Sequence, residues 1–103
     1  MDVKFAASFL PAAGTLIVEG DVDTSSAPEL YGAMKAAAPT DGRALVVDLT
    51  RVMYLDSSAI AALCDFLVSH DLEIHVTADS AVDTTMRITG LHRLARLHRV
   101  QQS

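Results

Sequence analysis

The middle of the chain contains a strand, a helix and a second strand in succession, and this unit restricts the folds that the sequence can adopt. The first strand, Arg43 to Leu49, includes a continuous apolar run, which is typical of a parallel strand covered on both faces. The helix has the spacing of a core-facing stripe, formed by Ile60, Leu63, Cys64, Leu67 and Val68. In the second strand, Leu72 to Thr77, apolar and polar residues alternate, so we expect one buried face and a place nearer an edge. The unit predicts a right-handed crossover between parallel strands.

Two further strands and a helix are predicted before this unit. Val3 to Ser8 and Thr15 to Glu19 are the strands, and a Pro- and Gly-containing turn between them predicts an antiparallel hairpin. The segment Ser26 to Glu29 has the signature of a capping box, in which the Ser and Glu side chains each accept a hydrogen bond from a free backbone N–H at the helix start. That helix should run to about Ala38, because Pro39 cannot continue it.

The last quarter of the chain contains one well-marked helix and one ambiguous segment. Ser80 to Asp83 has the signature of a helix start, and Gly90 stands where helices commonly end in the left-handed conformation. Beyond Gly90 two alternatives stay open. The segment Ala95 to Val100 forms a last strand, or a short helix is lined by Leu91, Leu94, Leu97 and Val100.

These elements together predict an α/β fold. The expected sheet is mixed, with four to five strands that begin as an antiparallel hairpin and continue as parallel strands, and three or more helices accompany it. The sequence shows no internal repeat, low-complexity segment or linker, so we expect a single domain over residues 1–103.

Composition limits the kinds of function that the chain can have. The formal net charge of −5 offers little to a nucleic-acid backbone, whose binding depends on many Lys and Arg contacts. The single cysteine, Cys64, allows neither a disulfide framework nor a cysteine zinc site within one chain, and we expect it to be a core residue. The sequence indicates no metal or cofactor. No segment approaches the ~18 continuous apolar residues of a membrane span, and the apolar stretch from Phe5 to Ala13 is interrupted by Pro11, so we expect a cytoplasmic protein.

Polar residues follow three of the predicted strands. Because parallel strands share a direction, the loops after Glu19, Leu49 and Thr77 should meet at one edge of the sheet, where open α/β folds bind their ligands. That edge would gather Asp21, Asp23, Asp56, Ser57, Ser58 and Asp79.

Asp56 is a natural N-cap for the central helix, with Ser57 and Ser58 in its first turn. A phosphate on Ser57 would add about −1.5 to −2 charges where the positive end of the helix dipole tolerates them. It would therefore alter a partner's contact with this edge rather than the fold. The plain alternative is that Asp-Ser-Ser is an ordinary helix start and the aspartates are solvated loop residues.

The sequence resembles the STAS domains, and in particular the stand-alone anti-sigma factor antagonists, over nearly its whole length. Val18 to Asp23 resembles the family's Gly-Glu/Asp-Leu/Val-Asp segment, and Thr24 to Leu30 its following helix start. Val46 to Thr50 and Leu55 to Ala59 together resemble the signature stretch, and Gly90-Leu91 resembles the Gly-Leu after the penultimate helix. Many members continue past the last short strand into another helix, for which this sequence has only Gln101-Gln102-Ser103, so we expect that helix's contacts to be absent or its cover to come from a partner or a second copy.

The resemblance implies a STAS-like fold and a function by partner switching. In such antagonists the residue after the signature Asp, here Ser57, is phosphorylated, and acidic residues matching Asp23 and Asp56 flank it. The unphosphorylated antagonist binds an anti-sigma factor that is also a serine kinase, which frees the sigma factor for transcription. Phosphorylation ends the binding, and a phosphatase acting on phospho-Ser57 restores it. The antagonist is no enzyme, and a weak homodimer is a further option.

The sequence leaves alternatives to the antagonist function. A STAS-type accessory subunit of an ABC lipid-transport system, which binds and stabilises an ATPase, is the alternative from a different class. An enzyme with Ser57 as nucleophile would need a histidine base, and no predicted strand-end loop contains one of the histidines, which are His70, His75, His92 and His98. The basic residues Arg87, Arg93, Arg96 and Arg99 form either a solvated face or a docking patch for an acidic partner or anionic lipid.

Overall fold

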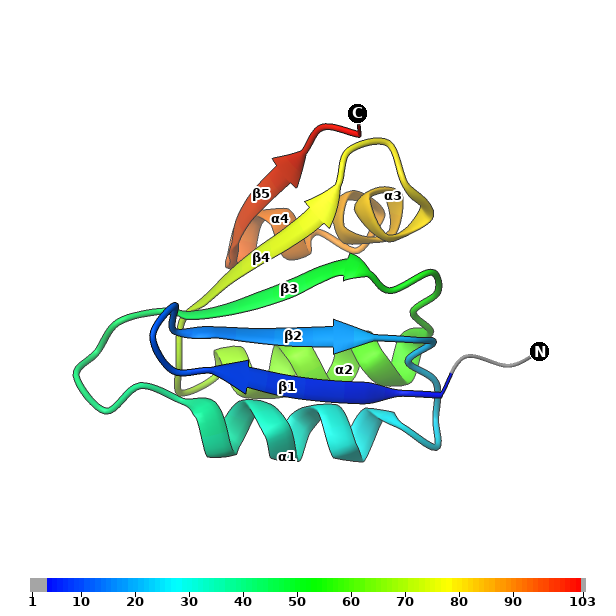
Figure 1. Ribbon diagram of the computed structural model, residues 1–103. Helices are drawn as coiled ribbons and strands as arrows, with labels where there is room; N and C mark the ends of the chain where they lie inside the picture. Colours follow the sequence, from blue (N-terminus) through cyan, green and yellow to red (C-terminus); the bar gives the residue numbers. More distant parts are fainter. Residues whose placement is uncertain (1–3, 103) are drawn as a thin grey trace.

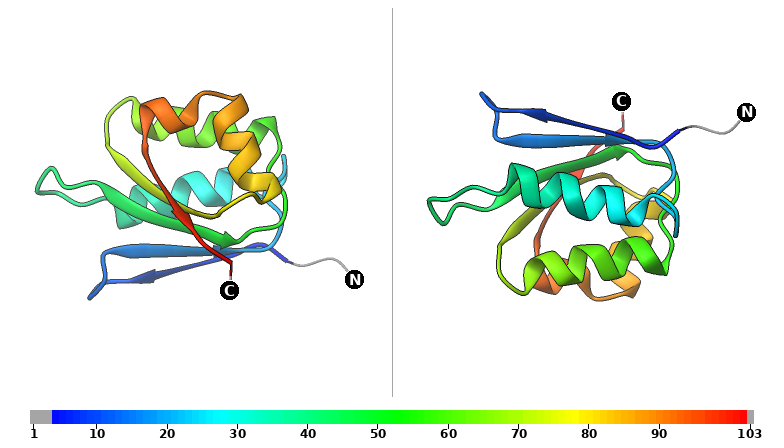
Figure 2. Two further views of the ribbon diagram at one scale, coloured as in Figure 1. Left: turned by 90° about the horizontal axis from the view of Figure 1, so that it is seen from above. Right: turned by 90° about the horizontal axis from the view of Figure 1, so that it is seen from below.

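The computed structural model describes residues 4–102, which form one mixed sheet with helices packed on one of its faces (Figures 1 and 2). In this part of the chain the strands are β1 (Ala6–Leu10), β2 (Thr15–Glu19), β3 (Leu45–Arg51), β4 (Leu72–Thr77) and β5 (Arg96–Val100). The helices are α1 (Ala27–Ala37), α2 (Ser57–Leu67), α3 (Ala81–Ile88) and α4 (Leu91–Leu94).

The strands lie side by side in their order along the chain, β1-β2-β3-β4-β5. β1 is antiparallel to β2, and every other neighbouring pair is parallel. This confirms the predicted mixed sheet and adds a third crossover, through α3 and α4 to β5. The two alternatives beyond Gly90 are each right in part, because Leu91–Leu94 is a short helix and Arg96–Val100 is a strand.

All helices cover the same face of the sheet. Each right-handed crossover adds its strand on the same side of the one before, so α1, α2 and the α3–α4 pair cannot alternate between faces. Figure 2 shows the sheet below and the helices above it in its left view. The largest fully buried side chains therefore lie between the sheet and this helical layer, among them Leu16, Leu30, Leu45, Leu63, Phe66 and Ile74.

The one-sided arrangement corrects the expectation for β3. Its residues alternate between buried and half-buried, with Leu45, Val47 and Leu49 facing the helices. Val46 and Asp48 point to the open face, so the continuous apolar run does not mark a strand covered on both faces. β4 has one buried face and lies nearer an edge than the central β3, as predicted, with β5 as the edge strand beside it.

The core-facing side of α2 is rotated from the predicted stripe. Its buried residues are Ala59, Ala62, Leu63 and Phe66. Ile60, Cys64 and Leu67 are half-buried against the core, whereas Val68 is 86% exposed. The difference arises because α2 packs on α1 as well as on the sheet.

The opening hairpin begins later than predicted. β1 covers Ala6–Leu10, and Val3 lies outside the described residues. β2 has the predicted bounds and is followed by Gly20, which has φ +88°. A Cβ at Gly20 would lie 2.5 Å from the carbonyl oxygen of Lys4, so only glycine fits where the chain enters the first strand. Within residues 4–102, no helix is both long and apolar enough to cross a membrane.

Candidate functional site

The loops that follow β2 and β3 are joined to each other by backbone hydrogen bonds. Val22 forms an isolated parallel bridge with Leu55, in which the Val22 N–H donates to Tyr54 O (3.0 Å) and the Asp56 N–H donates to Val22 O (3.1 Å). Val22 is fully buried, which anchors this contact in the core. The two loops are thus held as one rigid surface at the carboxyl ends of the parallel strands.

Asp56 is the N-cap of α2, as predicted. One carboxylate oxygen, Oδ1, accepts hydrogen bonds from the N–H groups of Ser58 (2.9 Å) and Ala59 (3.1 Å). The other oxygen, Oδ2, is 3.5 Å from the Thr24 hydroxyl, which donates to it. Thr24 Oγ1 also lies 3.2 Å from Ser58 Oγ, so side chains as well as backbone connect the two loops.

Ser57 is the first residue of α2, and its side chain is exposed. In the part of the chain that the structure describes, its hydroxyl forms no hydrogen bond, whereas the half-buried Ser58 is held by Thr24. The positive end of the α2 dipole lies at this position. Ser57 is therefore the serine of the pair that a second protein can reach without breaking a contact.

The capping box predicted for α1 is absent. The hydroxyl of Ser26 instead accepts a hydrogen bond from the Asp23 N–H (2.9 Å) and donates one to the Asp21 carbonyl oxygen (3.2 Å). Asp23 Oδ1 in turn accepts from the Ser25 hydroxyl (2.7 Å) and the Ser25 N–H (3.0 Å). The prediction was wrong because Asp23 Oδ1 accepts from the Ser26 N–H (3.1 Å), which the capping box would have assigned to Glu29, and closes the loop into a tight turn.

These hydrogen bonds fix the charge of Asp23. The Ser25 hydroxyl is the main cause that lowers the pKa of the Asp23 carboxyl, with the Ser26 N–H as the next. Asp23 therefore stays ionised, but one of its oxygens is occupied within the loop. Asp21, which precedes Val22 in the same loop, is exposed.

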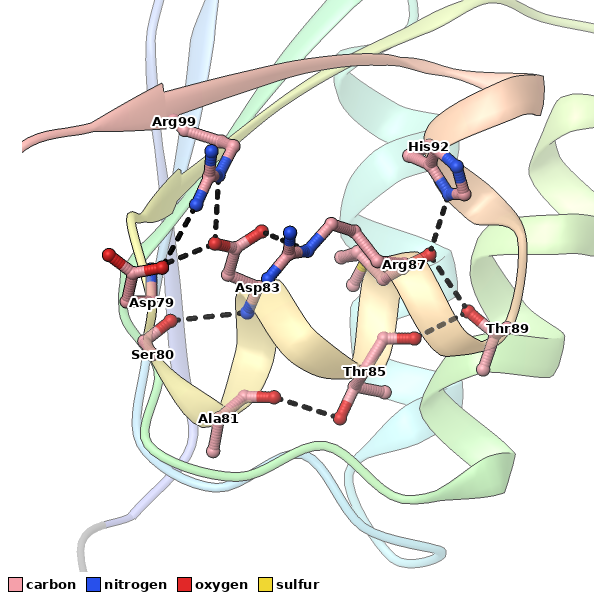
Figure 3. A network of polar contacts seen from close by, with 10 residues as sticks. Asp79, Ser80, Ala81, Asp83, Thr85, Arg87, Thr89, His92 and Arg99 are labelled. Carbon is pink, nitrogen blue, oxygen red and sulfur yellow. Dashed lines mark hydrogen bonds and ion pairs between the residues drawn. The ribbon is translucent and has the colours of Figure 1, made fainter.

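Asp79 follows β4 at the same end of the sheet, but its contacts are with a different group of residues (Figure 3). Its carboxylate pairs with Arg99 of β5 (3.1 Å), and its N–H donates to Asp83 Oδ2 (2.8 Å). No hydrogen bond connects Asp79 to Ser57 or Asp56 within residues 4–102. The loop after β4 is thus tied to β5, while the other predicted residues are tied to one another.

Asp83 is the centre of that second group, and its side chain is fully buried. Arg99 Nε donates to Oδ2 (2.8 Å), and Arg87 Nε is 3.6 Å from Oδ1. Burial opposes ionisation of Asp83, but the hydrogen bonds from Asp79 N–H and Arg99 outweigh it, and the pKa of Asp83 is lowered. The same contact raises the pKa of Arg99.

The four arginines of the last quarter do not form a free basic patch. Arg87 and Arg99 pair with Asp83, and Arg96 pairs with Glu73 on β4 (3.4 Å), whereas the exposed Arg93 has no ion pair within residues 4–102. The positive charges of Arg87, Arg96 and Arg99 are therefore paired with carboxylates of the same molecule. This arrangement favours the interpretation as a solvated, internally paired face over a docking patch.

The histidines lie away from Ser57. His75 on β4 bonds to Glu73 (2.7 Å) and has its ring centroid 4.8 Å from that of His98 on β5. His70 stacks on Phe66 at the far end of α2, and His92 is in α4. No group of three His, Cys, Asp or Glu residues that could hold a metal ion occurs within residues 4–102.

Two exposed apolar residues that shortly precede Ser57 in the chain were not predicted as part of the site. Met53 is 75% exposed and Tyr54 is 53% exposed, both in the loop that leads into α2. Large apolar side chains between the end of a strand and a capping aspartate are a signal that could have been noticed, because such loops are usually polar. They add apolar surface to an otherwise acidic and hydroxyl-bearing edge.

Comparison with known proteins identifies one matching family model and several similar folds. Residues 5–98 match the family model described as "Mlab, STAS domain". No curated protein sequence matches the chain. The fold resembles the crystal structure of an anti-sigma factor antagonist from Mycobacterium paratuberculosis, with TM-score 0.72 and 22% identity over 94% of this chain and 86% of the other.

A second similar structure is a chain in the crystal structure of diguanylate cyclase SiaD in complex with its activator SiaC from Pseudomonas aeruginosa. It has TM-score 0.57 and 20% identity, and the match covers 99% of this chain and 93% of that chain. At such low identities these two likenesses concern the fold.

Proposed function

This chain belongs to the STAS domain family, and we propose that it is an anti-sigma factor antagonist that works by partner switching. In its unphosphorylated form it binds an anti-sigma factor with serine kinase activity, so that the sigma factor is released to transcribe. Phosphorylation of Ser57 ends the binding, and a phosphatase restores it. The protein acts in the cytoplasm by binding and catalyses no reaction itself.

The exposed hydroxyl of Ser57 is the observation that carries the proposal. It stands on the first residue of α2 and is not used in any hydrogen bond of the described residues, so a kinase can reach it without disturbing the fold. Its neighbours are fixed by the Val22–Leu55 bridge and by the Asp56 cap. A kinase would therefore meet a preformed surface.

The charge of the phosphate on Ser57 is what would switch partner binding off. The partner interface consists of Asp21, Asp23, Asp56 and Ser58 around Ser57, and Asp79 would form its outer limit. A phosphate adds about −1.5 to −2 charges to these carboxylates, and this charge has to be desolvated when a partner docks. The helix N-terminus favours the same charge, so the cost falls on the interface rather than on the fold.

Phosphate mapping tests the proposal directly. The purified protein is incubated with ATP and each candidate anti-sigma kinase, and any phosphate is located by mass spectrometry. We expect phosphate at Ser57, none in Ser57→Ala, and full modification in the matched variant Ser58→Ala. Phosphate at Ser58 in the unaltered protein would contradict the assignment of the site.

The accessory subunit of a lipid-transport system is distinguished by the same experiment. Such a subunit would bind its ATPase through a constitutive contact, so no kinase would modify Ser57 and Ser57→Ala would leave its binding unchanged. That pair of results would replace partner switching with the accessory role.

A further inference from the structure

A shallow apolar groove lies between α1 and α2, beside the Ser57 edge. The two helices run next to each other in the right view of Figure 2. The groove has a volume of about 430 Å³, and its walls are Ala27, Pro28 and Tyr31 on α1 and Ala61 and Ala62 on α2. Small side chains on both helices leave room there for one or two large apolar side chains from outside.

The two ends of the groove differ in chemistry. One end reaches the hydroxyls of Thr24 and Ser58, next to Ser57. The other end reaches Asp65, whose exposed carboxylate forms no ion pair or hydrogen bond within residues 4–102. Ser58 and Asp65 are seven residues apart on α2, which corresponds to roughly 10 Å along the helix axis. No Lys, Arg or His lines the groove.

We propose that this α1–α2 groove binds an amphipathic, basic helix of the switching partner. An apolar side chain of that helix fills the space between Ala27, Tyr31 and Ala61, and an Arg or Lys about one turn away pairs with Asp65. Helix-in-groove recognition uses apolar anchors at this spacing, and tyrosine is enriched among residues that dominate binding energy. The proposal rests on the proposed function, because it assigns the contact that holds the partner beside Ser57.

The groove also explains how one phosphate could affect a larger contact. The basic contact at Asp65 lies at the end remote from Ser57, so a phosphate is not neutralised by it. The phosphate instead adds a hydrated, charged group at the hydroxyl end of the groove, next to the apolar lining from which a docked helix must exclude water.

The test uses the whole protein labelled with 15N and a synthetic amphipathic helical peptide of leucine and arginine. We expect NMR shift changes concentrated at Tyr31, Ala61, Ala62 and Asp65. A peptide with glutamate in place of arginine should bind about tenfold more weakly, because it meets Asp65 with the same charge. Asp65→Lys should reverse this preference, whereas Asp71→Lys, at an exposed position that does not line the groove, should not.

Matched variants decide whether the groove itself is used. Ala61→Glu places a charge in the apolar contact and should weaken the peptide about tenfold. Ala36→Glu adds the same charge to an exposed position of α1 outside the groove and should leave binding unchanged. Equal effects of the two variants, or shift changes elsewhere, would overturn the proposal. Groove shifts that depend on protein concentration without peptide would assign the groove to a second copy of the chain.

The outcome can be separated from that of the proposed function. Peptide binding in the groove without any phosphorylation of Ser57 would refute partner switching and retain the groove. Phosphorylation of Ser57 at equal rates in Ala61→Glu and Ala36→Glu, without peptide binding, would refute the groove and retain the switch.

Discussion

The hydroxyl of Thr24 lies 3.2 Å from the hydroxyl of Ser58, and this contact joins the loop before α1 to the first turn of α2. Thr24 also donates to Asp56 Oδ2 at 3.5 Å, so one side chain contacts both the cap and the serine next to Ser57. We expect Thr24→Val to lower the free energy of unfolding by about 0.5–1.5 kcal/mol, measured by urea denaturation, because it keeps the shape and removes the hydrogen bonds. Thr40→Val, at an exposed position, is the matched control and should change stability very little.

Asp56 should matter to the fold as well as to the site. Asp56→Ala removes the acceptor for the Ser58 and Ala59 N–H groups and should cost about 0.5–2 kcal/mol of stability. Asp56→Asn retains a capping oxygen and should stay close to the wild-type melting temperature. Similar losses in both variants would mean that the charge, and not the cap, is what stabilises α2.

A negative charge on Ser57 should be tolerated by the fold and rejected by the partner. Ser57→Asp is expected to change the free energy of unfolding by no more than about 1 kcal/mol, in the stabilising direction, because it lies at the positive end of α2. Ser69→Asp places the same charge just beyond the other end of this helix and should be slightly destabilising.

Binding to the kinase separates the two roles of this position. Ser57→Ala should bind and resist release, whereas Ser57→Asp should bind poorly in a calorimetric titration. Equal affinities of the two variants would end the partner-switching interpretation. A loss of several kcal/mol of stability in Ser57→Asp would show that the serine is not placed as described.

The buried Asp83 should make stability depend on acid pH. Its pKa in the folded state is below the ordinary value of 3.8, so its contribution is fully present above that value and is lost as the pH falls below it. Asp83→Asn should lower the free energy of unfolding by about 1–3 kcal/mol at neutral pH, because Arg99 loses a charged partner.

The difference between wild type and Asp83→Asn should shrink when denaturation is repeated at about pH 3. Asp71→Asn, an exposed position, provides the control. A difference that stays constant down to that pH would show that Asp83 does not titrate with a lowered pKa.

Two glycines should respond in opposite directions to the same substitution. Gly20→Ala meets the Lys4 carbonyl at 2.5 Å with a positive φ, so we expect a loss of more than about 1 kcal/mol. Gly32 lies inside α1, where an added Cβ meets nothing within 4 Å, so Gly32→Ala should stabilise the protein by about 0.5–1 kcal/mol. Thermal denaturation of both variants measures the contrast.

The sequence was sufficient for the elements whose signals are local. The periodicity of α2, the cap at Asp56 and the end at Gly90 follow from short patterns, and the mixed sheet follows from the order of the elements. The open face of β3 could not be predicted, because hydrophobicity alone does not tell whether later strands will continue on one side of the sheet. The hydrogen bond from the Ser26 N–H to Asp23, which replaces the capping box, likewise depends on the folded loop.

The candidate site was predictable to the same degree. Parallel-strand geometry brought Asp21, Asp23 and Asp56 to one edge, but it gave no information on which carboxylates are paired. Asp79 instead pairs with Arg99, which is twenty residues distant in the sequence. The α1–α2 groove depends on small residues in two helices whose approach only the tertiary structure reveals.

The sequential strand order also has a kinetic consequence. Each parallel pair joins strands that are separated along the chain by a whole crossover, so the sheet cannot form before distant segments meet, and such pairing is comparatively slow. The Val22–Leu55 bridge and the Asp56 cap lie in the first sixty residues. Because domains generally fold as units, the surface around Ser57 takes its final form only together with the strands that follow it, β5 included.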